Sequence, residues 1–269
     1  MRICSLAEGI SDAEYTQVEA EFSEYCNSFL NDDESINQGI ELKKEHSFRV
    51  CRNAVIIAEA LGIADNCMNT VKTAALLHDI GRFEQFLRFR TFADSKSVNH
   101  AILGSGIITS TGILKNIDKK TSGMIKAVVG VHNVLTLGTG ETELIILLQI
   151  VRDADKLDIL RVITDYYNKR NLYNPLKIDL PDTGVISPAV CRSIKNAEPV
   201  DMSDLLSIED FKLLVAAWVF DINFDRTREL LIEKGYIETI LDTLPETESV
   251  TEVSEFIRKE LGTGKQFAA

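Results

Sequence analysis

Apolar residues recur at helical spacing along almost the whole chain of 269 residues. Apolar positions three and four residues apart place a hydrophobic stripe on one face of a helix. The segments 12–31, 40–61 and 70–80 have this pattern, and so does the long segment 141–168. Alternating runs of β-branched residues, which would indicate strands, are hard to find. The sequence therefore predicts an all-α fold.

The composition of the chain changes after Asn171, because four of its five prolines fall between residues 175 and 199. Proline disfavours long regular helices, so this stretch is predicted to be a connection. Helices are predicted to resume after Ser207 and Ser249, each of which can cap one. We therefore expect a first domain at 1–172. Residues 173–269 are expected to supply a Pro-rich connection and a C-terminal helical extension packed on that domain.

The formal net charge of −12 bears on the partners of the protein. Such an acidic chain gains nothing from bulk attraction to phosphate backbones or anionic lipids, so we expect neither a nucleic-acid polymer nor a membrane as its partner. Apolar runs such as 144–151 are too short to span a bilayer, and the N-terminus lacks a secretory segment. We expect a cytoplasmic protein with a small-molecule substrate, and a homodimer is left open.

The chain has only four histidines, and they all lie between residues 46 and 132. His46 precedes Val50 by four residues and so extends the apolar stripe of its predicted helix. Asp153 lies on another apolar stripe, between Ile150 and Leu157. An unpaired carboxylate is costly to bury. This pattern predicts either a metal ligand at Asp153 or a salt bridge to a nearby arginine.

The most specific local feature is the pair His78-Asp79, which stands in the run 74–82, Ala-Ala-Leu-Leu-His-Asp-Ile-Gly-Arg. Gly81 is expected to end the helix that carries this pair. Neighbours on a helix point about 100° apart. Two such side chains can hold one metal ion from two sides, or the carboxylate can bridge two ions. Imidazole with carboxylate suits Fe, Mn, Ni, Zn or Co better than Ca.

The ordered pattern H…HD…H…H…D resembles the HD-domain superfamily of metal-dependent phosphohydrolases, in its six-ligand variant, over about residues 40–170. The residues that carry the resemblance are His46, His78, Asp79, His100, His132 and Asp153. It implies an HD-domain-like helical bundle that binds two divalent metal ions (Fe, Mn, Ni, Co, Zn or Mg). It further implies that His46, His78 and Asp153 hold one ion, that His100 and His132 hold the other, and that Asp79 bridges them.

Basic residues near this pattern are candidates for substrate contacts. Arg82 follows the His-Asp-Ile-Gly run and can hold a phosphate, and Lys156 follows Asp153 by three residues. We predict catalytic roles for Asp79, Arg82 and Lys156. A helix-terminal cation at Arg82 and a simple ion pair at Lys156 are the alternatives. Arg49 is expected either to orient a ligand or to lie on the surface.

The basic run of Arg82, Arg88, Arg90 and Lys96 has two interpretations. It predicts either a lid that steers phosphate to the site or a solvated basic face.

The resemblance favours hydrolysis of a phosphomonoester or phosphodiester by metal-activated water, with a nucleotide or a related small molecule as the substrate. Two alternatives remain open. The same six ligands resemble those of HD-type di-iron oxygenases, which cleave C–C or C–P bonds with O₂. A non-catalytic, metal-bearing signalling module is the third interpretation, and a degraded ligand set would favour it.

Overall fold

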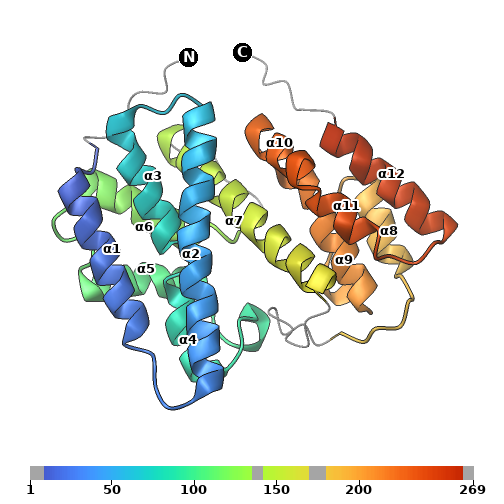
Figure 1. Ribbon diagram of the computed structural model, residues 1–269, viewed down its shortest axis with the longest axis horizontal. Coiled ribbons are helices and arrows are strands. Elements are labelled where there is room, and N and C mark those ends of the chain that lie inside the picture. Colours follow the sequence, from blue (N-terminus) through green and yellow to red (C-terminus); the bar gives the residue numbers. More distant parts are fainter. Residues whose placement is uncertain (1–8, 135–141, 170–179, 263–269) are drawn as a thin grey trace. The chain divides into compact units, whose positions relative to one another are not determined.

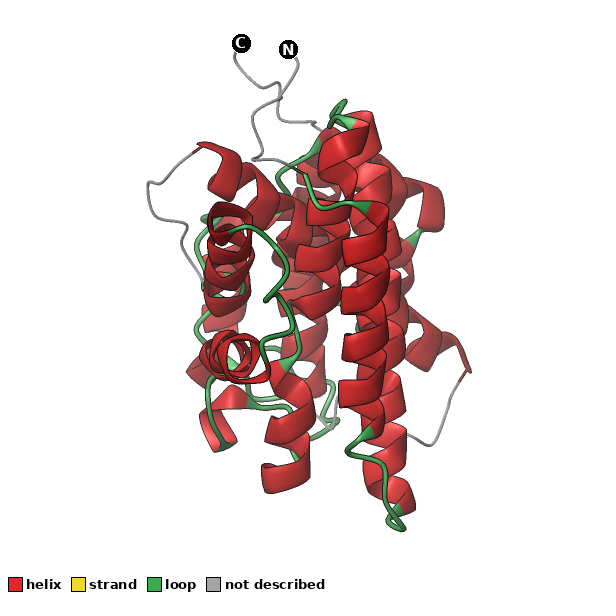
Figure 2. Ribbon diagram, turned by 90° about the vertical axis from the view of Figure 1, so that its left-hand side faces the viewer, coloured by secondary structure: helices red, strands yellow, loops and turns green. Residues whose placement is uncertain are grey.

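The computed structural model describes residues 9–134, 142–169 and 180–262. Helices and loops make up these ranges, with no strand among them (Figure 2). The predicted all-α class is confirmed. No helix in the described ranges is long and apolar enough to cross a membrane. The chain forms two compact units, Met1–Asp158 and Ile159–Ala269.

The described residues of the first unit form one short 3-10 helix, η1, and seven α-helices, the last of which extends past the unit boundary. Their bounds are α1 Asp12–Asn27, α2 Glu34–Ala60, α3 Asp65–Leu77, α4 Gly81–Phe89, η1 Asp94–Lys96, α5 His100–Thr111, α6 Lys119–Val131 and α7 Thr142–Lys169. Helix α2 packs along α3 and against α4 (Figure 1). Helix α5 packs against both α4 and α6. The unit boundary falls inside α7, so this helix contributes to both units.

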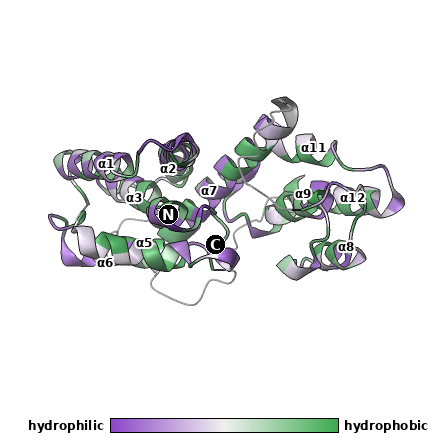
Figure 3. Ribbon diagram, turned by 90° about the horizontal axis from the view of Figure 1, so that it is seen from below, coloured by the Kyte–Doolittle hydropathy of each residue, from purple (hydrophilic) through white to green (hydrophobic). Residues whose placement is uncertain are grey.

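The second unit contains the end of α7 and the helices that follow it. Their bounds are α8 Pro188–Lys195, η2 Met202–Asp204, α9 Ile208–Ala216, η3 Ala217–Asp221, α10 Asp225–Lys234, α11 Tyr236–Leu241 and α12 Glu248–Gly262. Helix α12 packs on η3 and α8, and α9 packs on α11. The helices α5 of the first unit and α9 of the second are hydrophobic over much of their length (Figure 3).

The predicted domain boundary at residues 172 and 173 lies outside the described residues, and it stays a prediction. The predicted cap at Ser207 is present, because its hydroxyl accepts a hydrogen bond from the Asp210 amide. The last helix is capped two residues earlier than predicted. Thr247, not Ser249, accepts the hydrogen bond from the Val250 amide.

The segment after Gly81 differs from the sequence expectation. Gly81 does not end a helix there but begins α4, which packs beside α5. A side chain on Gly81 would meet the carbonyl oxygen of His100 at 2.1 Å and the amide nitrogen of Gly104 at 2.8 Å. This glycine is therefore required by the close approach of two backbones, which periodicity within one helix does not reveal.

Candidate metal centre

The four histidines come from different helices of the first unit, and all are buried. His46 lies within α2, on the face that also buries Val50 and Ala54. His78 and His132 directly follow the last residues of α3 and α6. His100 is the first residue of α5, whose N-terminus is capped by Asn99. Helix ends thus place three of the four imidazoles.

Each imidazole is held through its Nδ1 atom. The Nδ1 atoms of His78 and His132 lie 2.7 and 2.9 Å from the carbonyl oxygens of Ala75 and Val129. A carbonyl oxygen only accepts, so both Nδ1 atoms must donate. The Nδ1 atom of His46 lies 2.7 Å from Asp158, and that of His100 lies 2.7 Å from Asp94.

These Nδ1 contacts decide which nitrogen is free to bind a metal. A neutral imidazole that donates through Nδ1 carries its lone pair on Nε2. Hydrogen bonds of this kind are the usual means by which proteins orient a metal-binding histidine. All four Nε2 atoms are therefore prepared as ligands in the same way.

The Nε2 atoms converge on Asp79 in two groups. His46 and His78 lie 3.6 and 3.7 Å from Asp79 Oδ2. His100 and His132 lie 3.2 and 3.7 Å from Asp79 Oδ1. In both groups the donor atoms lie within 4.8 Å of one another, as the ligands of a single ion must. Each oxygen of one carboxylate thus faces its own pair of histidines.

Several donor atoms at this site lack the partners that buried polar atoms normally have. Among the described residues, His46 Nε2, His78 Nε2 and Asp155 Oδ1 are buried without a hydrogen bond of good geometry. The Nε2 atoms of His100 and His132 are 3.0 Å apart. When both rings are neutral, these are two lone pairs facing each other, an arrangement that a cation would stabilise. The donor set therefore fits metal ions.

Helix α7 places the carboxylate of Asp155 beside the first pair of histidines, His46 and His78. Its Oδ1 atom lies 3.1 Å from His46 Nε2 and 3.6 Å from His78 Nε2. Asp153, the residue expected here, is fully buried. Two residues along a helix correspond to a turn of about 200°. The two carboxylates therefore project from nearly opposite sides of α7. Asp155 is the one that lies beside His46 and His78, and the ligand role predicted for Asp153 stays a prediction.

Asp158, one turn after Asp155, supports the same site. It accepts the His46 contact and also a bidentate contact from Arg49, whose Nε and Nη2 atoms lie 2.7 and 3.1 Å from its two oxygens. Arg49 thus orients a histidine through a carboxylate. The sequence signal for Asp158 was its spacing from Asp155, since residues three apart share a helix face.

The charges of the site keep its carboxylates ionised. Burial would raise the pKa of Asp79, but the charges of Lys43, His78 and Arg82 hold that pKa well below its usual range. Burial likewise opposes ionisation of Asp155, and the imidazoles of His46 and His78 outweigh it, so its pKa is also well below the usual range. Ionised carboxylates are the form that binds cations.

The histidines differ in charge state. Burial lowers the pKa of His100 to about 4, with Arg82 acting in the same direction and Asp94 opposing it. His100 is thus neutral near pH 7 and has a free lone pair. Burial and Lys43 lower the pKa of His46, but Asp155 and Asp158 outweigh them and the net shift is upward. Binding of a cation at His46 would therefore displace a proton.

The predicted basic run divides between the site and the surface. Arg82 points inward, with Nη1 2.9 Å from Asp94 and Nε 3.4 Å from Asp79 Oδ1. Arg88 and Arg90 form exposed ion pairs with Glu84 and Asp33. For Arg88 and Arg90 the exposed ion pairs favour the second of the two interpretations, a solvated basic face.

Two further lysines flank the site. Lys156 is partly exposed beside Asp155, and its predicted catalytic role stays a prediction. Lys43, which was not predicted from the sequence, places its Nζ atom 2.7 Å from Asp79 Oδ2. Its position three residues before His46 was the signal available in the sequence.

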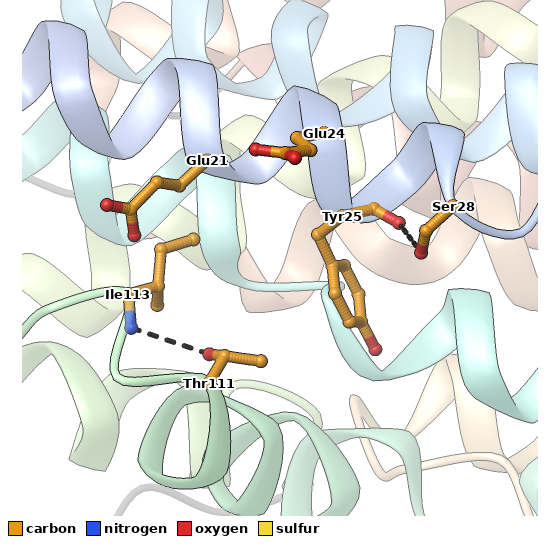
Figure 4. Close-up of a pocket in the computed structure, with 6 residues that line it drawn as sticks. All are labelled: Glu21, Glu24, Tyr25, Ser28, Thr111 and Ile113. Atoms are coloured by element: carbon orange, nitrogen blue, oxygen red, sulfur yellow. Dashed lines mark hydrogen bonds between the residues drawn. The ribbon is translucent and has the colours of Figure 1, made fainter.

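A separate pocket of about 370 Å³ lies between α1 and the end of α5 (Figure 4). Its lining consists of Glu21, Glu24, Tyr25, Ser28, Thr111 and Ile113. None of these residues is a candidate metal ligand. Two carboxylates without a basic residue in the lining disfavour an anion there, so the histidine site is the candidate for anion chemistry.

Helices of the first unit thus gather buried histidines and aspartates that could hold metal ions. Residues 44–160 match the family model of the HD domain. This stretch is similar to the HD-domain family, whose members are generally metal-dependent phosphohydrolases, and its histidine and aspartate groups fit a metal site of that type. Neither a curated protein nor a solved structure matches the chain.

Proposed function

We propose that this protein is a phosphohydrolase that uses two divalent metal ions to cleave a small phosphomonoester or phosphodiester, such as a nucleotide. The observation that carries the proposal is the division of Asp79, whose Oδ2 and Oδ1 atoms face separate pairs of histidines. A carboxylate in that position suits a bridge between two ions. The intact ligand set disfavours a non-catalytic module.

The residues that would hold each ion follow from the two groups. His46, His78 and Asp155 would join Asp79 Oδ2 at the first ion. His100 and His132 would join Asp79 Oδ1 at the second. Divalent ions held this way would supply positive charge, which lowers the pKa of a bound water and neutralises phosphoryl oxygens.

The surrounding residues orient the ligands and attract the substrate. Asp158 and Asp94 each fix one imidazole through its Nδ1 atom. The Arg82 guanidinium lies beside Asp79, within reach of an anion bound at the second histidine pair. Its planar fork suits phosphoryl oxygens. These basic groups support a phosphate-containing substrate in a chain that is otherwise acidic.

The test combines metal analysis with a substrate panel. Protein purified with and without oxygen is analysed for Fe, Mn, Ni, Co, Zn and Mg, and then assayed for release of phosphate from monoesters and of nucleotide from diesters. We expect about two ions per chain and hydrolysis that does not require O₂. The matched variant His78→Ala with Asp79→Ala should lose both the metal and the activity.

The contrary results are equally specific. Iron with O₂ consumption and no phosphate release would replace the hydrolase with a di-iron oxygenase, because that chemistry uses the same histidine and carboxylate ligands. No bound metal in the wild-type protein, together with an unaltered fold in the double variant, would remove the metal site itself from consideration.

A further inference from the structure

Two cations flank Asp79, one at each of its carboxylate oxygens. The Nζ atom of Lys43 lies 2.7 Å from Oδ2, and the Nε atom of Arg82 lies 3.4 Å from Oδ1. Each oxygen therefore faces both a cation and a pair of histidines. A metal ion that takes either oxygen must share it with a positive side chain or displace that side chain.

The Lys43 side chain is held close to the site by aromatic packing. It is 15% exposed, and its ammonium lies 5.4 Å from the centroid of the Phe92 ring. Phe92 in turn stacks on Phe86, with ring centroids 4.4 Å apart. The Phe86 ring occupies the space beside Gly39, one turn earlier on α2, where a side chain would meet it at 2.2 Å. This packing limits how far Lys43 can withdraw.

Lys43 and Arg82 differ in the ion-pair partners that they would keep if metal ions bound Asp79. Arg82 keeps Asp94 as an ion-pair partner at 2.9 Å, and it also donates to the carbonyl oxygen of Phe92. Within the described part of the chain, Asp79 is the one carboxylate within ion-pair distance of Lys43. A largely buried ammonium that loses its counter-ion is costly unless another anion replaces it.

The charge balance of the site also favours binding of an anion when metal ions are present. Four carboxylates face three cationic side chains: Asp79, Asp94, Asp155 and Asp158 against Lys43, Arg49 and Arg82. Asp94 and Asp158 are already paired with the two arginines. Two divalent ions would reverse this balance and leave an excess of positive charge, which an anionic ligand would offset.

We propose that Lys43 is an anion-binding residue, which neutralises Asp79 in the metal-free protein and binds a phosphoryl oxygen of the substrate in the metal-loaded protein. The ligand class is a phosphate group, and the assignment presupposes the proposed function. Metal ions and Lys43 compete for Asp79 Oδ2, so Lys43 should oppose metal binding while it favours phosphate binding. A merely structural lysine would not have these opposite effects.

The experiment compares Lys43→Met with Lys44→Met, the same substitution one residue along the helix. Lys44 forms an exposed hydrogen bond to Asn27 and serves as the control. Calorimetry first measures Mn²⁺ binding to each metal-free protein. It then measures binding of inorganic phosphate to each Mn²⁺-loaded protein. Circular dichroism verifies that the variants are folded, and Lys43→Arg tests whether a cation is sufficient.

Lys43→Met should bind Mn²⁺ at least as tightly as the wild type, because a competitor for Asp79 is gone. It should bind phosphate about 10- to 100-fold more weakly, the effect of one lost hydrogen bond to a charged group. Lys43→Arg should recover part of the phosphate affinity, and Lys44→Met should match the wild type in both titrations.

Unchanged phosphate affinity in Lys43→Met would overturn the assignment, and so would weaker Mn²⁺ binding in a folded variant. The outcomes separate this inference from the proposed function. A wild type that binds phosphate through Lys43 but hydrolyses no ester would refute only the hydrolase. A wild type that hydrolyses esters while Lys43→Met binds phosphate normally would refute only the role of Lys43.

Discussion

The two halves of the metal centre orient their histidines in the same way but differ in how many ligands they offer. Each half has one imidazole backed by a carboxylate and one backed by a main-chain carbonyl. The first half adds Asp155, which lies 3.1 Å from His46 Nε2. The second half has two histidines and shares Asp79, and no further carboxylate of the described residues joins its group.

The difference in the number of ligands predicts which half should bind metal more tightly. The first half offers two imidazoles and two carboxylates, and the second offers two imidazoles and one carboxylate. An additional anionic ligand strengthens binding of a divalent cation, whereas an open position leaves room for water or substrate. We therefore expect a tighter first ion and a more exchangeable second ion.

The largest effect is expected from Asp79→Asn, because both halves depend on this carboxylate. The variant should lose both ions and lower the phosphohydrolase rate by more than about 100-fold, the upper range for residues that only support a ligand. Metal analysis and phosphate release measure the two effects. An Asp79→Asn protein that still holds two ions would contradict the bridging position.

Substitution at Asp155 should break one half and leave the other. Asp155→Asn is expected to lose the tighter ion, with metal affinity reduced by at least about 10-fold, while binding to the second half remains. Asp153→Asn is the matched comparison. It should keep both ions and lose roughly 1–3 kcal/mol of unfolding free energy, because its buried carboxylate is replaced. Titration with Mn²⁺ and denaturant unfolding distinguish the two residues, and loss of metal in Asp153→Asn alone would restore the sequence assignment.

A smaller effect should follow from removing the carboxylates that orient the histidines. Asp158→Asn is expected to weaken the first half, and Asp94→Asn the second, each by about 10- to 100-fold in metal affinity. Two-site calorimetry reads the halves separately. Asp33→Asn, which removes an exposed partner of Arg90, provides the control and should change neither. Equal weakening of both halves by either variant would argue that the halves are not independent.

The smallest effect is expected on thermal stability. An ion present at 100 times its dissociation constant contributes about 2.7 kcal/mol to the folded state. For a protein of this size, that corresponds to roughly 5–10 °C in melting temperature. Chelation should lower the melting temperature by such an amount, and His100→Ala with His132→Ala should show a smaller drop on chelation. An unchanged melting temperature after complete metal removal would count against ions that link α2, α3 and α7.

The burial of His46 and His78 could be predicted because their environment is local. His46 lies on the apolar stripe of α2. Its burial could be predicted from Val50 and Ala54, which come four and eight residues later. His78-Asp79 stood at the end of an apolar run, and the run is buried. In both cases a residue's own helix determines which way it faces, so periodicity is sufficient.

The choice between Asp153 and Asp155 could not be made in this way. The stripe that contains Asp153 is buried as predicted, since Ile150 and Leu157 are buried too. Helix α7 also carries site residues on its other side, at Asp155 and Asp158. Periodicity identifies a buried face, but it does not tell which face meets His46. Only the packing of α7 beside α2 brings Asp155 to that histidine.

Helical periodicity and residue type are local properties, and they were enough to predict the all-α class, the burial of His46 and the His78-Asp79 pair. The tertiary structure decided the rest. It selected Asp155, divided the two oxygens of Asp79 between two pairs of histidines, and brought Lys43 to 2.7 Å from one of them. The physical reason is that distances between side chains on different helices are set by close packing, as at Gly81, where two backbones meet.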